Sequence, residues 1–146
     1  MGLSPHERAE LCICLNLRMA SRAVTQYYDA QLRPSGIKAT QLPVLTLAEA
    51  NGPMTMSHLA DELVMERTTL TRNLKPLQRR GLIRIEEGED RRARLVVLTE
   101  AGRKAMARAA PLWQRAQARM VRGLGRKRFG ELLQELGATV AVAAER

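Results

Sequence analysis

The stretch MSHLADELVMERTTLTRNLKPLQRRGLIRIEEGEDRRARLVVLTEAG, residues 56–102, decides the fold. It begins with two segments whose apolar residues recur at steps of three and four, as in α-helices, and a short break at residues 64–66 separates them. The second segment ends at Gly81, and two β-like runs follow, residues 82–86 and 94–98, with a charged turn between them. Two helices followed by a hairpin are the order of a winged helix-turn-helix. We therefore predict a mainly α fold with a small β-hairpin wing.

Length, composition and charge narrow the class of protein. The 146 residues are enough for one domain that buries its own core. A net charge of +9 and a pI near 10.7 favour an anionic partner, with nucleic acid ahead of a membrane. No apolar run approaches the roughly 20 residues of a membrane-spanning helix, and residues 1–11 lack the apolar core of a signal peptide. We therefore expect a cytoplasmic protein that does not enter membranes.

Long helices are predicted on both sides of this stretch. One continuous helix is expected over residues 4–32, and two more over residues 100–123 and 126–143, while Thr40 should cap a shorter helix over residues 41–50. The apolar faces of the first helix and the last two are wide, so a single chain would leave them exposed to water. These exposed apolar faces predict a homodimer, in which a second copy covers them.

The predicted organisation is a single domain over residues 1–146. Its winged helix should span residues about 38–100. Dimerisation helices should flank it over residues about 4–33 and about 100–143.

The second helix of the opening stretch carries the side chains expected to contact DNA. In a helix-turn-helix this helix lies in the major groove, and its N-terminal part meets the base edges. Arginine can bridge two guanine acceptors there, and a threonine methyl can touch a thymine methyl. The candidate DNA-binding residues on this helix are Arg67, Thr68, Thr69, Thr71, Arg72 and Lys75. Lys75, Arg79 and Arg80 are expected to hold phosphates, which position a protein without reading sequence.

The turn between the two β-like runs supplies a second set of cations. Arg91, Arg92 and Arg94 are long enough to enter a minor groove, where narrow A·T tracts attract arginine. Asp90 is out of place on a DNA-facing turn, and we expect it to orient a neighbouring arginine through charge-assisted hydrogen bonds. The alternative is that all these arginines form an ordinary solvated basic surface. Duplex DNA is the favoured partner because the order of elements, the spacing and the charge agree.

Two segments resemble one known family. The segment DRRARLVVLTEAG, residues 90–102, is similar to the wing signature of the MarR family at Asp90, Arg92, Leu98, Thr99 and Gly102. The segment MERTTLTRNLKPLQRRGLI resembles the recognition helix of that family and its exit into the wing. The resemblance covers essentially the whole chain. It implies a homodimer whose first helix and last two helices intertwine, with Arg92 at the wing tip reaching the minor groove of a pseudo-palindromic operator. It also implies a repressor that a small molecule or an oxidant releases from DNA.

The two cysteines, Cys12 and Cys14, raise the question of a metal or redox site. On a continuous helix, residues two apart point about 200° apart, so the two sulfurs should neither meet nor share an ion within one chain. We therefore predict no metal and no cofactor.

The segment CLNLRMASRAVTQYYDAQLRPSGI resembles the first helix of the organic-hydroperoxide sensors of the MarR family. Cys14 falls on their peroxide-reactive cysteine, and Tyr28 matches one of the two tyrosines that hydrogen-bond it. Arg18 replaces the other tyrosine, where it could stabilise a thiolate but removes a partner that the subgroup uses. The alternative is that Cys14 is a small buried residue in the dimer core.

A small-molecule effector competes with oxidation as the signal. The resemblance implies a phenolic or aromatic acid in a cleft between the dimer helices and the winged helix, with Arg18, Tyr27, Tyr28 and Trp113 as candidate lining residues. Sequence-tolerant, architectural DNA binding is the alternative to a sequence-specific regulator. An enzyme is not expected, because the sequence has no nucleophile–base pair, phosphate-binding glycine loop or metal cluster.

Overall fold

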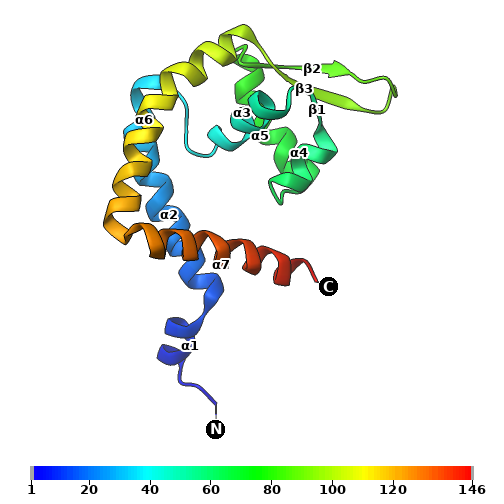
Figure 1. Ribbon diagram of the computed structural model, residues 1–146. Helices are drawn as coiled ribbons and strands as arrows, with labels where there is room; N and C mark the ends of the chain where they lie inside the picture. Colours follow the sequence, from blue (N-terminus) through cyan, green and yellow to red (C-terminus); the bar gives the residue numbers. More distant parts are fainter. Residues whose placement is uncertain (1, 146) are drawn as a thin grey trace.

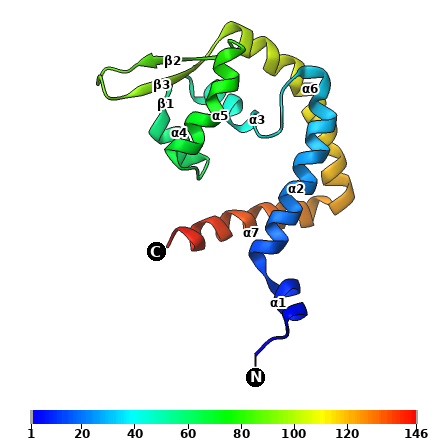
Figure 2. The same ribbon diagram turned by 180° about the vertical axis from the view of Figure 1, so that it is seen from behind.

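The computed structural model describes residues 2–145 and shows a winged helix carried on a scaffold of long helices (Figure 1). Helix α1 (Pro5–Leu11) is followed by α2 (Ile13–Leu32), and the C-terminal part consists of α6 (Glu100–Leu124) and α7 (Arg126–Ala144). Helices α2 and α6 lie side by side, and α7 leaves the end of α6 at a sharp angle. Seen from behind, α1 projects away from the rest of the molecule (Figure 2). No helix within residues 2–145 is long and apolar enough to cross a membrane.

The winged helix itself contains three helices and a small sheet. The helices are α3 (Leu42–Asn51), α4 (Met56–Glu62) and α5 (Arg67–Arg79). The strands are β1 (Met54–Thr55), β2 (Ile83–Glu87) and β3 (Arg94–Leu98), and they form an antiparallel sheet in the order β1-β3-β2. The predicted mainly α fold with a wing is confirmed. Strand β1 was not predicted, because two residues are too few to show an alternating pattern.

The buried core lies inside the winged helix and extends into the first half of α6. Its largest fully buried side chains are Leu32, Ile37, Val44, Leu45, Leu59, Leu70, Leu74, Leu77 and Val96. Ala105, Met106 and Ala109 of α6 complete this cluster, so α6 is packed firmly against the winged helix at its N-terminal end. The described residues of α1 and α7 include none that is buried.

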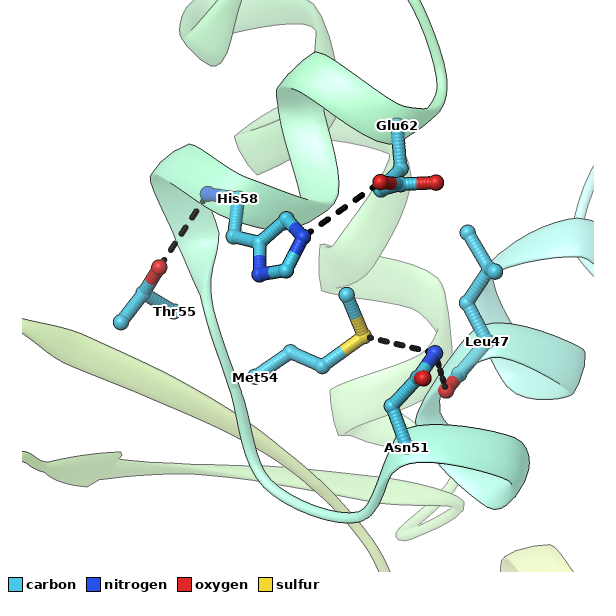
Figure 3. A network of polar contacts seen from close by, with 6 residues as sticks. All are labelled: Leu47, Asn51, Met54, Thr55, His58 and Glu62. Atoms are coloured by element: carbon cyan, nitrogen blue, oxygen red, sulfur yellow. Dashed lines mark hydrogen bonds and ion pairs between the residues drawn. The ribbon is translucent and has the colours of Figure 1, made fainter.

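A small polar network fixes the start of α4 (Figure 3). The Thr55 hydroxyl accepts a hydrogen bond from the His58 backbone N–H at 3.1 Å, so Thr55 caps α4. The Asn51 side chain, at the end of α3, donates to the Leu47 carbonyl at 3.0 Å and to the Met54 sulfur at 3.7 Å. These contacts join the end of α3 to β1 and cap α4 directly after β1.

The predicted continuous helix over residues 4–32 is wrong, because the chain leaves helical geometry at Cys12. Cys12 has an extended backbone (φ −74°, ψ 106°) and stands between α1 and α2. Its sulfur accepts from the Leu15 backbone N–H at 3.4 Å, and the Asn16 side chain donates to the carbonyls of Glu10 and Cys12 at 3.0 and 2.9 Å. These side chains satisfy the backbone groups that a helix would otherwise pair.

The predicted cap of the next helix is also wrong. Gln41, not Thr40, precedes α3, and no side chain caps the helix there. The Gln41 side chain instead accepts from the Lys38 backbone N–H at 3.0 Å. Asp29 of α2 accepts from the Ala39 backbone N–H at 2.7 Å. This loop is therefore held by side chains of α2 and Gln41 rather than by a threonine cap.

The junction between β3 and α6 is closely packed. The Thr99 hydroxyl accepts from the Gly102 backbone N–H at 3.0 Å, which caps α6, and donates to the Gly81 carbonyl at 2.6 Å. A Cβ atom at Gly102 would lie 2.2 Å from the Leu82 carbonyl oxygen and 2.5 Å from a Leu98 methyl carbon. Because Gly102 has no side chain, the backbone of the first turn of α6 packs directly against the backbone of Leu82, and Thr99 joins the two through hydrogen bonds.

Candidate nucleic-acid interface

Helix α5 presents one apolar and one cationic face. Leu70, Leu74 and Leu77 are buried and form the apolar face of the helix. The opposite face forms an open depression of about 400 Å³ lined by Arg67, Thr68, Thr71, Arg72 and Lys75. Thr69 is exposed but is not among these lining residues. The structure thus brings five of the six candidate residues of this helix onto one surface.

The hydroxyl of Thr71 is used within the helix. It donates to the Arg67 carbonyl at 2.9 Å, one helical turn earlier. The hydroxyl hydrogen is therefore already used, and the methyl group and the acceptor lone pairs of the oxygen remain for external contacts. A threonine methyl in this position suits the methyl group of a thymine.

The base of the wing lies beside α5. A second depression, of about 280 Å³, is lined by residues of both elements, including Arg67 and Thr71 of α5, Ile85 of β2 and Arg94 of β3. Arg94 Nη1 lies 3.7 Å from a Glu87 carboxylate oxygen, and both side chains are about half exposed or more. Arg67 and Arg94, which lie far apart in the sequence, therefore contribute to one continuous surface.

The tip of the wing is a hydrogen-bonded turn. Gly88 N–H donates to the Ala93 carbonyl at 2.9 Å, and Ala93 N–H donates to the Asp90 carbonyl at 2.8 Å. Arg91 and Arg92 lie in this turn and are exposed. The tip thus carries two adjacent guanidinium groups beyond the end of the sheet.

Asp90 orients the neighbouring Arg92, as predicted, and it does so through the backbone of Arg92. Its carboxylate accepts from the backbone N–H of Arg92 at 3.1 Å, as in an Asx-turn. Among the described residues, the ion pairs within 4.0 Å include none made by Asp90. Asp90 therefore shapes the backbone that presents Arg92 and leaves the guanidinium groups to other partners.

Arg80 has a hydrogen-bond partner within the chain. Its Nη1 donates to the Gly36 carbonyl at 2.7 Å, across 44 residues of sequence. This contact ties the end of α5 to the loop after the 3₁₀ turn η1 (Arg33–Ser35). Arg80 is exposed and its guanidinium group has five N–H donors, so the phosphate contact stays a prediction beside this structural bond.

The candidate sensing residues do not meet within one chain. Cys12 and Cys14 are exposed free thiols, so Cys14 is not buried in the single chain. Tyr28 lies fourteen residues after Cys14 on α2, which is about 21 Å along the helix axis. Its hydroxyl instead donates to the Gln117 side chain of α6. Arg18 lies one turn beyond Cys14, as expected from the helix.

Tyr27 and Tyr28 form a small aromatic cluster against α6. Their rings meet edge to face, with centroids 5.6 Å apart, and the Arg119 guanidinium carbon lies 5.4 Å from the Tyr27 ring centroid. Burial, and to a lesser extent the neighbouring Tyr27, raises the pKa of Tyr28 above its usual value. The Tyr28 hydroxyl therefore stays protonated and acts as a hydrogen-bond donor to Gln117.

Two cavities meet at Trp113 of α6. One, of about 520 Å³, lies between α3 and α6 and is lined by Leu42, Pro43, Thr46, Leu47, Glu49, Leu63, Met106, Ala110 and Trp113. The other, of about 710 Å³, lies at the turn from α6 to α7 and is lined by Trp113, Gln114, Gln117, Ala118, Val121, Arg122, Gly125 and Arg126. Arg18, Tyr27 and Tyr28 line neither, although Tyr28 reaches the second through Gln117. Within residues 2–145, no three His, Cys, Asp or Glu side chains lie close enough together to hold a metal ion.

The chain is similar to known regulators of transcription. A family model described as the MarR family matches residues 35–93. The uncharacterised HTH-type transcriptional regulator YwoH of Bacillus subtilis is 34% identical over 88 residues, which are 60% of this chain and 64% of YwoH, so the match spans less than two thirds of that relative.

Two further proteins match over a larger share of their length. The organic hydroperoxide resistance transcriptional regulator of Bacillus subtilis is 33% identical over 98 residues, which are 66% of this chain and 67% of the relative. The transcriptional regulator MosR of M. tuberculosis, solved in complex with DNA, is 39% identical and superposes with a TM-score of 0.81. That match covers 91% of this chain and 98% of MosR.

Proposed function

The chain belongs to the MarR family of DNA-binding transcriptional regulators, which are not enzymes, and we propose that it is a homodimeric repressor of a pseudo-palindromic operator. We further propose that a small aromatic molecule or oxidation of a cysteine releases it from DNA. The following observations on single residues support these steps.

The shared surface of α5 and the wing is the observation that carries the proposal. Arg67 and Arg94 line one depression, and the exposed cations Arg72 and Lys75 extend it along α5. Such a surface neutralises phosphates, while the N-terminal part of α5 is the part that meets base edges in a helix-turn-helix. Arg91 and Arg92 lie at the wing tip, where a minor groove beside the major-groove site would receive them.

The exposed apolar side chains of the long helices support the dimer. They occur on α1, α2 and α7, outside the winged helix, and the largest are Leu11, Ile13, Leu15, Met19, Val24, Leu132, Leu133, Leu136, Val140 and Val142. A soluble monomer rarely leaves so many apolar side chains together in water. A second copy that covers them would place two α5 helices on successive turns of one face of the duplex.

Titration of operator and bulk DNA tests the proposed function. We expect the protein to bind one operator at least about 10³-fold more tightly than unrelated DNA at the same salt concentration. The operator can be selected from random duplexes and confirmed by footprinting, and affinity can be measured by fluorescence anisotropy. If affinity follows only the salt concentration and ignores sequence, the protein is an architectural binder and the regulator proposal fails.

The exposed thiols support oxidation as one release signal. Cys14 lies in the first turn of α2 directly after the break at Cys12, so an oxidant can reach it in the single chain. Tyr28 cannot contact Cys14 of its own chain, so a tyrosine partner would have to come from the second copy. Any oxidised sulfur here would stand at the junction of α1 and α2 and would change how α1 packs in the dimer.

Replacing Cys14 by serine should leave operator binding within about twofold of the wild type, because the position is far from α5 and the wing. In the wild type, an organic hydroperoxide should release the operator, and the Cys14→Ser variant should stay bound. Cys12→Ser is the matched control, since its thiol is also exposed but precedes α2. Anisotropy with labelled operator and mass analysis of the thiols measure both steps. A wild type that ignores hydroperoxide would exclude oxidation as the signal.

The cavity between α3 and α6 supports a small aromatic effector. Its lining is mainly apolar, with Trp113 available to stack on a ring and Thr46 and Glu49 available to hydrogen-bond a phenolic hydroxyl. Trp113 also lines the cavity at the turn from α6 to α7, where Arg122 and Arg126 suit a carboxylate. An effector that moves Trp113 would therefore act on the α6–α7 turn, and so on the spacing of the two α5 helices.

A further inference from the structure

The turn between α4 and α5 contains a residue in an unfavourable backbone conformation. Val64 has a φ of 53°, and among the residues that the structure describes it is the only non-glycine residue with positive φ. Met65 N–H donates to the Ala60 carbonyl at 2.9 Å and Val64 N–H donates to the Asp61 carbonyl at 3.1 Å. This pair of bonds is a Schellman motif, in which Val64 occupies the left-handed position that glycine usually takes.

Valine is poorly suited to this position. Its branched Cβ crowds the backbone in the left-handed region, and a β-branched residue with positive φ is a genuine outlier. The side chain is 72% exposed, the largest fraction among the exposed large apolar residues. Packing within the chain therefore does not offset the strain, and glycine would complete the same turn without it.

The position of Val64 relative to α5 indicates what its side chain contacts. Glu66 is the N-cap residue of α5, so Val64 lies three positions before Arg67, at the N-terminal end of this helix. This is the end of α5 that meets base edges in a helix-turn-helix. In the major groove, the C5-methyl group of thymine is the apolar feature of the base edges. An exposed, stiff isopropyl group suits such a methyl group, because valine loses little rotational freedom on contact.

We propose that Val64 is a specificity-determining residue whose isopropyl group packs against the methyl group of one thymine in each half-site. This inference rests on the proposed function, because it requires that α5 enters the major groove. The strained turn presents the side chain in a fixed direction, and the contact with DNA is the compensation for the strain. Glycine at this position would relax the turn and remove the contact.

Replacement of single thymines by deoxyuridine tests the contact, because deoxyuridine lacks only the methyl group. Each thymine of the selected operator is replaced in turn, symmetrically in both half-sites, and the affinities of wild type and Val64→Gly are measured. One replacement should weaken wild-type binding about fourfold per half-site, the effect of one buried methyl-sized group, and should leave Val64→Gly unaffected. Replacements that weaken both proteins equally would mark thymines that contact other residues, such as Thr68 or Thr71.

The stability of Val64→Gly separates a DNA contact from a packing role. Its Tm, measured at the same protein concentration, should equal or exceed that of the wild type, while its affinity for the unmodified operator falls. A Tm lower by several degrees, or a weaker dimer, would overturn the inference, because Val64 would then pack within the protein. The wild type can prefer its operator while every deoxyuridine replacement weakens the wild type and Val64→Gly equally. That result would overturn the Val64 contact and leave the proposed function standing. A wild type without operator preference would overturn the proposed function as well.

Discussion

Replacing Gly102 by alanine should lower the free energy of unfolding by about 3 kcal/mol or more, the upper range for an overpacked core. The added Cβ would lie 2.2 Å from the Leu82 carbonyl oxygen and 2.5 Å from a Leu98 methyl carbon. The first contact is with backbone, which cannot rotate away as a side chain could. Helix α6 would have to move away from the sheet, and the Thr99 hydroxyl would lose its bonds to Gly102 and Gly81.

Gly123→Ala is the matched control, because it makes the same chemical change in the same helix. A Cβ at Gly123 meets nothing within 4 Å in the chain. Alanine there should raise the free energy of unfolding by up to about 1 kcal/mol, because alanine has a higher helix propensity than glycine. Urea unfolding at one fixed protein concentration measures both changes. Equal stability of the two variants would mean that α6 does not approach the sheet as closely as the structure places it.

The fold could be predicted where local patterns decide it. The helix-turn-helix, the two wing strands and the Thr99 cap follow from the spacing of apolar residues and from capping chemistry. The break at Cys12 does not, because periodicity cannot show that the Asn16 side chain pairs with the carbonyls of Glu10 and Cys12. Gly102 could be matched to a family signature, but its reason is a contact with Leu82, which only the tertiary structure supplies.

Some residues of the candidate site also follow from local sequence, and others only from the tertiary structure. Arg67, Arg72 and Lys75 follow from helical spacing, since residues three and four apart share a face. The bond from Arg80 to the Gly36 carbonyl does not follow from local sequence, because the two residues lie 44 positions apart. Val64 was treated as part of a break between helices. A signal was present, since a short turn after a helix usually needs a left-handed residue and the sequence has no glycine at residues 64–66.

Replacing Arg92 by alanine should weaken operator binding at least about tenfold, because a dimer loses one arginine contact at each of its two wings. Arg92 lies in the exposed turn at the wing tip, and Asp90 fixes its backbone N–H at 3.1 Å. The variant should keep the wild-type Tm and remain a dimer, since the side chain has no part in the core. Anisotropy titration at fixed salt, with sedimentation of the free protein, measures affinity and assembly.

Arg128→Ala separates a minor-groove contact from a general effect of charge. It removes the same charge from an exposed position on α7, away from the wing, and should change affinity by less than about twofold. If Arg92 enters a narrow minor groove, replacing the A·T pairs under the wing by G·C should weaken the wild type more than Arg92→Ala, because the narrow groove attracts arginine. Equal losses in both proteins would instead make Arg92 a phosphate contact. Arg92→Ala would then reduce the dependence of affinity on salt by about one unit per wing and leave sequence preference intact.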